Sequence, residues 1–262
     1  MIKSITELIS VIKKDFMSWK TCPKPWFRGE SGNGPALCPK IASHTAHEEN
    51  YLLQSFQRQA GGLANVPPRE YFDMWLFLAQ HYGVPTRLLD WTEGALHALY
   101  FALNRKADNP RIYMLDPQKL NELAGLKNFF PNYPLSWVKG GGIYVALAWQ
   151  NRTLTEFQQR EAVEEIGLNL NIPLAFPATY QDQRMIAQRS CFTIHGKALE
   201  PLSEIIRKNN IVASDCLYEY KIDIRSRIDL LRELSILGVS AATIFPDLDH
   251  LAEDLTIDIR GF

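Results

Sequence analysis

Apolar positions recur every three or four residues near the start of the chain and predict a helix over residues 4–16. Ser4 and Glu7 match a capping box, in which a hydroxyl and a carboxylate satisfy free backbone N–H groups at the helix start. The same apolar spacing predicts helices at 46–60 and 69–82, and glycine follows each of them. The first third of the chain therefore has a helical character.

Residues 93–103 are apolar nearly all round, which predicts a buried helix. Predicted strands lie at 26–29, 86–91, 111–115, 142–148, 191–195, 217–224 and 241–245, and further helices at 154–166, 182–188, 202–208, 226–237 and 250–255. The long helical stretch before His81 does not fit a strict alternation of strand and helix. We therefore predict an α+β fold with a mostly antiparallel or mixed central sheet flanked by helices.

Nothing in the sequence divides the chain into parts. It contains no internal repeat, low-complexity segment or long linker, so residues 1–262 are expected to form a single domain. The segment 125–142 is rich in aromatic residues, proline and glycine, and we expect it to be an insertion or a mobile loop.

Composition narrows the class of protein. Hydrophobic residues make up 46% and charged residues 22%, which is typical of a globular protein and excludes a disordered chain. The net charge of -1 gives the whole chain no basic character of the kind that nucleic-acid binding favours. The four cysteines form no CxxC pair, and no apolar run approaches the roughly 20 residues of a membrane span. The expected compartment is the cytoplasm, without a membrane or a metal.

The densest polar cluster within apolar sequence is the segment 81–92. A buried charge is costly unless it is paired, so Arg87 and Asp90 are expected to have partners, and each could be the partner of the other. One interpretation is a structural ion pair, followed by Thr92 as a cap of the next helix. The other is a rigid turn that presents His81, Thr86 and Arg87 to a ligand.

Arg28 is a second candidate, because it follows two aromatic residues and precedes Gly29. A guanidinium group suits phosphate or carboxylate recognition, since its fork donates two parallel hydrogen bonds. Glycine beside it would allow a backbone to approach closely. The alternative is a surface salt bridge between Arg28 and Glu30.

Arg184 and Gln188 lie one helical turn apart and share a face. They either brace the following strand or complete a polar site. His44 and His47 could be metal ligands, but the sequence offers no third ligand at a convincing spacing.

Four segments together resemble the FRG domain family. They are Phe27-Arg28-Gly29; the string His81-Tyr82-Gly83-Val84-Pro85-Thr86-Arg87-Leu88-Leu89-Asp90-Trp91-Thr92 with Ala98–Ala102 after it; Arg184 and Gln188 before Phe192-Thr193; and Gly238 with Phe245–Asp249. The segments occur in the family's order. Ser190-Cys191 departs from the family pattern, which more often has glycine there. The resemblance implies a bacterial or phage-associated protein, of toxin or phage-defence type.

A more distant resemblance is to arginine-class ADP-ribosyltransferases, whose NAD site begins with an aromatic-Arg-Gly strand. This resemblance implies an ADP-ribosyltransferase-like fold and NAD as the substrate. Arg28 would then hold the NAD phosphates, and Gly29 and Arg87 would also be among the residues that bind NAD. Thr86 or Thr92 would brace the nicotinamide side, and Tyr82 or His81 would stack on its ring.

The catalytic glutamate of those enzymes has no obvious counterpart in this chain. The matching region offers Gln188, and Asp90 could supply a carboxylate from another direction. The acceptor would be a nucleic acid or a protein, and an antitoxin or another partner protein is expected.

Two other functions stay open. In the first, a non-catalytic recognition module binds a nucleotide, a nucleic acid or a phosphorylated partner through Arg28, Arg87 and Arg184. In the second, His81 and Asp90 belong to a metal-dependent nuclease or phosphatase.

Overall fold

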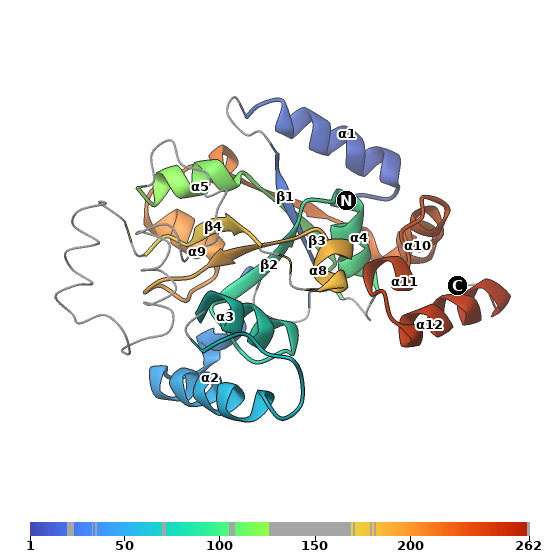
Figure 1. The fold of residues 1–262 in the computed structure, drawn as a ribbon. Helices are drawn as coiled ribbons and strands as arrows, with labels where there is room; N and C mark the ends of the chain where they lie inside the picture. Colours follow the sequence, from blue (N-terminus) through green and yellow to red (C-terminus); the bar gives the residue numbers. More distant parts are fainter. Residues whose placement is uncertain are drawn as a thin grey trace.

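The computed structural model describes residues 1–19, 24–32, 34, 36–69, 72–104, 108–125, 169, 171–178, 180 and 182–260. Figure 1 shows a central sheet with helices on both of its faces. The α+β prediction is therefore confirmed. The predicted strand at 142–148 and helix at 154–166 lie outside the described residues, as does the predicted insertion at 125–142 apart from Gly125.

The six strands of the sheet are β1 Trp26–Glu30, β2 Leu88–Thr92, β3 Arg111–Leu115, β4 Leu174–Pro177, β5 Ser190–Ile194 and β6 Leu217–Lys221. Their order is β4-β5-β2-β1-β3-β6, and every neighbouring pair is antiparallel. The two strands that carry the strongest sequence motifs, β1 and β2, therefore lie side by side at the centre.

The helices are α1 Ile5–Phe16, α2 Ala46–Ala60, α3 Phe72–His81, α4 Ala95–Leu103, α5 Pro117–Leu123, α8 Gln183–Ala187, α9 Leu202–Lys208, α10 Arg227–Ile236, α11 Ala241–Ile244 and α12 Leu248–Arg260, with 3-10 turns η1 Lys40–Ser43, η3 Ala213–Asp215 and η4 Ile224–Ser226. None of the helices described is long and apolar enough to cross a membrane.

Two hydrophobic cores hold the helices to the sheet. One core joins α2, α3 and α9 to β2, β4 and β5, and contains Leu53, Trp75 and Phe176. The other core joins α1, α4 and α10 to β1 and β3, and contains Leu8 and Leu99. Both faces of the sheet are therefore covered.

Helix α4 packs directly on the backbone of β1 at Gly29. A Cβ atom on Gly29 would lie 1.8 Å from the carbonyl oxygen of Ala98 and 2.7 Å from the backbone nitrogen of Ala102. Only glycine fits there. The close approach predicted for Gly29 thus exists, but the backbone that approaches belongs to α4.

The predicted strand at 241–245 is wrong, because residues Ala241–Ile244 form the short helix α11. Ile244 and its neighbours have strand propensity, but the start of the helix is held by hydrogen bonds. Ser240 and Thr243 form a capping box, and the Asp254 carboxylate accepts from the backbone N–H groups of Ala241 and Ala242 at 3.0 and 2.8 Å. These long-range contacts override the local preference.

Candidate functional site

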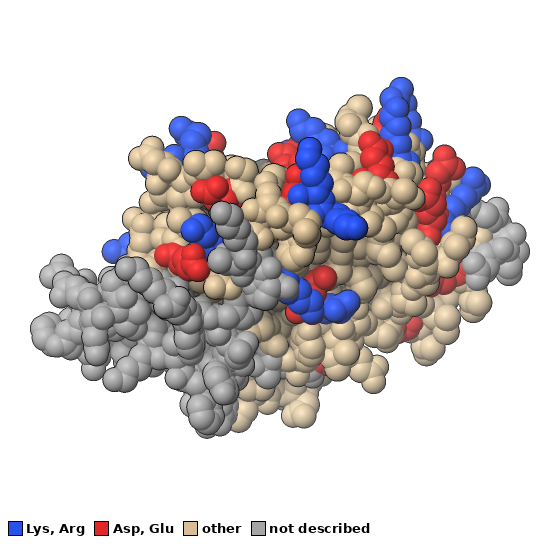
Figure 2. All heavy atoms as spheres, turned by 90° about the horizontal axis from the view of Figure 1, so that it is seen from above, with Lys and Arg blue, Asp and Glu red and all other residues tan. Residues whose placement is uncertain are grey.

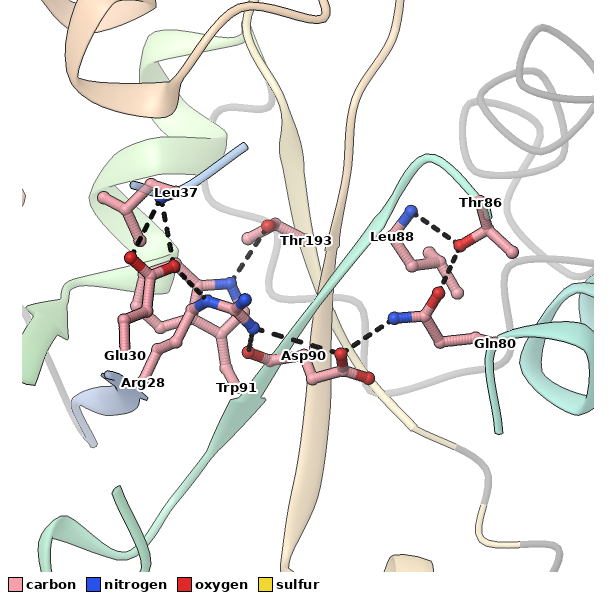
Figure 3. Close-up of polar contacts among 9 residues, drawn as sticks. All are labelled: Arg28, Glu30, Leu37, Gln80, Thr86, Leu88, Asp90, Trp91 and Thr193. Carbon is pink, nitrogen blue, oxygen red and sulfur yellow. Dashed lines mark hydrogen bonds and ion pairs between the residues drawn. The ribbon is translucent and has the colours of Figure 1, made fainter. Parts of the chain in front are cut away.

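The sheet opens between its two central strands. Strands β1 and β2 share one register pair, Phe27 with Thr92, whereas β1 and β3 pair at five positions. Beyond that pair, a side chain links the two strands. Nη1 of Arg28 in β1 donates to the backbone carbonyl oxygen of Asp90 in β2 at 2.8 Å (Figure 3). The side chain of Arg28 therefore bridges the opening.

A cavity of about 750 Å³ lies at this opening. Residues of β1, β2 and β5 line it, together with the C-terminal end of α3 and with α8. The volume is within the range of small-molecule and cofactor sites. Of the predicted site residues, Arg28, Gly29, His81, Tyr82, Asp90, Thr92 and Gln188 line the cavity, and Thr86 and Arg87 do not.

Arg28 is held on both sides by acidic residues. Its Nε donates to Oε1 of Glu30 at 2.8 Å, and its Nη1 lies 3.9 Å from Oδ2 of Asp90. The predicted salt bridge between Arg28 and Glu30 is therefore present, and it lies inside the cavity. Its Nη2 has no hydrogen bond to any described residue.

Glu30 is a cavity residue whose importance the sequence did not indicate beyond its pairing with Arg28. Its side chain is 15% exposed, and Oε1 also accepts from the backbone N–H of Leu37 at 3.1 Å. Leu37 has a φ of +51°, so the loop folds back toward the strand to make this contact. A carboxylate fixed next to Arg28 is a group that can stabilise a developing positive charge.

Gln80 was also missed, although it directly precedes the 81–92 segment. Its Nε2 donates to Oδ2 of Asp90 at 2.8 Å, and its Oε1 accepts from the hydroxyl of Thr86 (Figure 3). Thr86 is fully buried and therefore acts on the cavity through Gln80. The predicted direct contact between Thr86 and a ligand has no support in this arrangement.

Arg87 and Asp90 each have a partner, as predicted, but the partner of Arg87 is Glu49 and not Asp90. Arg87 is 4% exposed and forms a bidentate pair with Glu49 of α2, at 2.6 and 2.8 Å, and its Nη1 donates to the carbonyl of Gly196. Arg87 points into the core, where burial would be costly without this partner. It therefore ties α2 to the end of β2 and makes no contact with the cavity.

His81 and Tyr82 lie where α3 ends at the cavity. Nδ1 of His81 lies 3.1 Å from Oδ2 of Asp182, and the two rings of His81 and Tyr82 meet edge to face at 5.0 Å. Tyr82 is 61% exposed, and Gly83 ends the helix with a φ of +80°. Both rings are therefore at the cavity wall, with Tyr82 at the solvent side.

Thr92 and Gln188 meet across the cavity wall. The hydroxyl of Thr92 donates to the carbonyl oxygen of Gln188 at 2.7 Å and accepts from the backbone N–H of Gly94 at 3.1 Å. Thr92 thus supports the start of α4, as one interpretation predicted, although the N-cap residue is Gly94. Arg184 also reaches the cavity, where its guanidinium lies 4.8 Å from the ring centroid of Phe245.

The cavity carries both signs of charge. Its described lining includes the cations Arg28, Lys40, Arg111 and Arg184, and the carboxylates Glu30 and Asp90. Figure 2 shows Lys and Arg interspersed with Asp and Glu on the face of the molecule in view. The described part of this face has no continuous basic stripe.

The described residues favour neither a reactive thiol nor a metal site at the cavity. Cys38 lines the cavity, but burial, with Glu30 nearby, raises the pKa of its thiol and keeps it protonated at neutral pH. In the part of the chain that the structure describes, no three His, Cys, Asp or Glu side chains lie close enough to hold a metal ion. His44 and His47 therefore lack further ligands among these residues.

Residues 23–111 match the family model of the FRG domain. The match begins just before β1 and ends at the first residue of β3, so it contains both strands at the opening, with α2, α3 and α4. The segments around Arg184 and Phe245 lie outside it. No curated protein and no solved structure matches the chain.

Proposed function

Since residues 23–111 make up an FRG domain, we propose that the cavity built on this domain binds NAD and that the protein transfers ADP-ribose to an acceptor. The observation that supports this most is Arg28, fixed between Glu30 and Asp90 inside a cavity of about 750 Å³. NAD carries two phosphates, an aromatic cation and a carboxamide, and the lining offers a counterpart for each.

In the proposed complex, Arg28 would bind the phosphates through Nη2, which has no hydrogen bond to a described residue, because a guanidinium donates well-directed hydrogen bonds to phosphate oxygens. The exposed ring of Tyr82, or His81 beside it, would stack on the nicotinamide. Arg87 would contribute only by fixing the fold beneath the cavity, since it is paired with Glu49.

The reaction would break the bond between ribose C1′ and the nicotinamide nitrogen, and the electron pair would leave with nicotinamide. A nucleophile of the acceptor would then bond to C1′ and lose its proton. Positive charge develops on the ribose in between, and a carboxylate nearby would stabilise it. Glu30 is fixed by two donors, and Asp90 is 58% exposed, so either could serve.

This activity would suit an effector of bacterial toxin or phage-defence type, with a protein or nucleic acid as the acceptor. A recognition module that binds a nucleotide or phosphorylated partner is the second candidate, favoured by the four cations in the lining.

Calorimetry of NAD binding to the wild-type protein, with release of nicotinamide followed in the presence of cell extract, tests the proposal. Arg28→Ala should abolish binding, and Arg207→Ala, at an exposed salt bridge outside the cavity, should leave it unchanged. Thermal unfolding confirms that both variants fold. Lack of NAD binding by the folded wild-type protein would refute the proposal.

Two conservative variants separate the roles of the carboxylates. Glu30→Gln and Asp90→Asn keep the size of each side chain and remove its charge. The catalytic carboxylate is the one whose replacement lowers nicotinamide release by about a hundredfold or more with little change in NAD affinity. If both variants bind NAD and release nicotinamide like the wild type, neither carboxylate is catalytic.

A further inference from the structure

Asp90 is the exposed residue of the central strand β2, whose other four residues are buried. The sheet opens beside it, and its side chain, which is 58% exposed, lines the cavity. A molecule in the cavity can therefore reach a carboxylate at the centre of the sheet.

A chain of three hydrogen bonds leads from the buried backbone to this carboxylate (Figure 3). The backbone N–H of Leu88 donates to Oγ1 of Thr86 at 3.1 Å, and the hydroxyl of Thr86 donates to Oε1 of Gln80 at 2.5 Å. Nε2 of Gln80 in turn donates to Oδ2 of Asp90 at 2.8 Å. Gln80 thus connects the core to the cavity.

The buried end of this chain fixes the orientation of the Gln80 amide. Thr86 is fully buried, and among the described residues its hydroxyl has one acceptor, Oε1 of Gln80. Turning the amide over would leave the buried hydroxyl without an acceptor, which costs free energy. The amide therefore presents its NH2 group to Asp90, whose Oδ2 has to accept, as an ionised carboxylate does.

The two carboxylates at the cavity are held in different ways. Oε1 of Glu30 accepts from Nε of Arg28 at 2.8 Å and from the backbone N–H of Leu37 at 3.1 Å, and the side chain is 15% exposed. Asp90 is held at Oδ2 by a neutral amide and lies 3.9 Å from Nη1 of Arg28. Its charge is therefore paired less closely with Arg28, and a ligand has better access to it.

We propose that Gln80 is a positioning residue, which fixes the Asp90 carboxylate at the cavity so that Asp90, and not Glu30, stabilises the positive charge that develops on the ribose. The part that concerns the reaction rests on the proposed function. A charged group stabilises a transition state best when it is oriented beforehand, because no reorganisation is then needed during the reaction. The hydrogen bond from Gln80 orients Asp90 before any substrate binds.

An exchange of donor and acceptor tests the positioning without any ligand. Gln80→Glu keeps the acceptor for Thr86 but places a carboxylate oxygen against Asp90, so the melting temperature should fall by about 3 °C. Adding Asp90→Asn supplies a donor in the opposite direction and should restore the melting temperature to within about 1 °C of the wild type. If the added substitution does not recover the loss, Gln80 does not hold Asp90 and the inference is refuted.

Release of nicotinamide tests the role in the reaction. Gln80→Met keeps the length of the side chain and removes both polar ends. It should slow the release from bound NAD by about tenfold or more with little change in NAD affinity. In a protein that already carries Asp90→Asn, the same substitution should have no further effect, because the two residues act as a unit. Release at the wild-type rate, or an equally large effect in the Asp90→Asn background, would overturn the inference.

Gln118→Met is the matched control. Nε2 of Gln118 likewise donates to a carboxylate, Oε1 of Glu122 at 3.4 Å, but neither residue lines the cavity. Its nicotinamide release should equal that of the wild type.

The two experiments also separate Gln80 from the proposed function. If the wild type binds no NAD but the exchange restores the melting temperature, the proposed function and the part of Asp90 in the reaction are refuted, and the positioning by Gln80 is supported. If NAD is bound and cleaved but the exchange fails, the proposed function stands and the positioning is refuted.

Discussion

The contact between β1 and α4 predicts that Gly29→Ala is strongly destabilising. The added Cβ would lie 1.8 Å from the carbonyl oxygen of Ala98, and real Cβ atoms essentially never lie within 3.0 Å of such an atom. Relief of the overlap requires α4 to move by about 1.2 Å, because the obstacle is helix backbone that cannot change its rotamer.

The loss of stability arises because this movement separates the buried side chains of α4 from the groups they pack against. Leu99, Leu103 and their neighbours on α4 are fully buried, and a gap of this size removes a large part of their dispersion contacts. Overpacking of a core costs about 1–3 kcal/mol when side chains can shift, so we expect about 3 kcal/mol or more for Gly29→Ala. For a chain of this length, the melting temperature would fall by on the order of 10 °C.

Urea denaturation and thermal unfolding measure this cost. Gly61→Ala is the matched control, since the nearest atom to its added Cβ is a side-chain carbon of Val66 at 3.8 Å. Gly61 lies at the end of α2 with a φ of -62°, so alanine fits its backbone conformation and should be neutral or slightly stabilising. The reasoning is refuted if Gly29→Ala unfolds within about 0.5 kcal/mol of the wild type.

Two further predictions concern the buried charges behind the cavity. Glu49→Gln should lower the free energy of unfolding, measured in urea, by about 3–5 kcal/mol, because it leaves Arg87 charged and poorly paired in the core. The double variant Glu49→Leu with Arg87→Met should recover most of this stability. Equal stability of Glu49→Gln and the wild type would contradict the reasoning. Burial, with Arg87 nearby, lowers the pKa of His195 in the folded protein to about 3. Between that value and the ordinary histidine pKa of about 6.5, His195 is protonated in the unfolded chain and neutral in the folded protein. Stability should therefore fall as pH falls from about 6.5 toward 3, by up to about 1.4 kcal/mol per pH unit from this residue. Urea denaturation should show a smaller pH slope for His195→Gln, whereas the exposed His47→Gln should keep the wild-type slope; equal slopes for all three proteins would refute the assignment.

Local patterns predicted the elements of the fold well where one face of the element is buried. The strand at 111–115 and the helix at 202–208 have the predicted bounds, because periodic apolar side chains decide both. The strand predicted at 241–245 failed since its conformation depends on Asp254, which is distant in sequence and lies on α12. Propensity contains no information about such a contact.

Local sequence patterns also predicted part of the candidate site. Arg28 and Asp90 were identified as polar residues in apolar surroundings, and they do meet at the cavity. The partner of Arg87 could not be foreseen, because Glu49 belongs to a helix whose register against β2 is set by packing. Gln188 was found through its spacing to Arg184, but its unpaired amide is visible only once the fold is known.

The single register pair between β1 and β2 makes the described sheet a joined pair of three-stranded halves, β4-β5-β2 and β1-β3-β6. The Phe-Arg-Gly motif belongs to one half, and the segment 81–92 leads into the other. A molecule in the cavity would touch both halves and serve as a cross-link that the backbone does not supply. Ligand binding should therefore slow amide hydrogen exchange in β1 and β2 together, so that the rigidity of the sheet reports on the occupancy of the cavity.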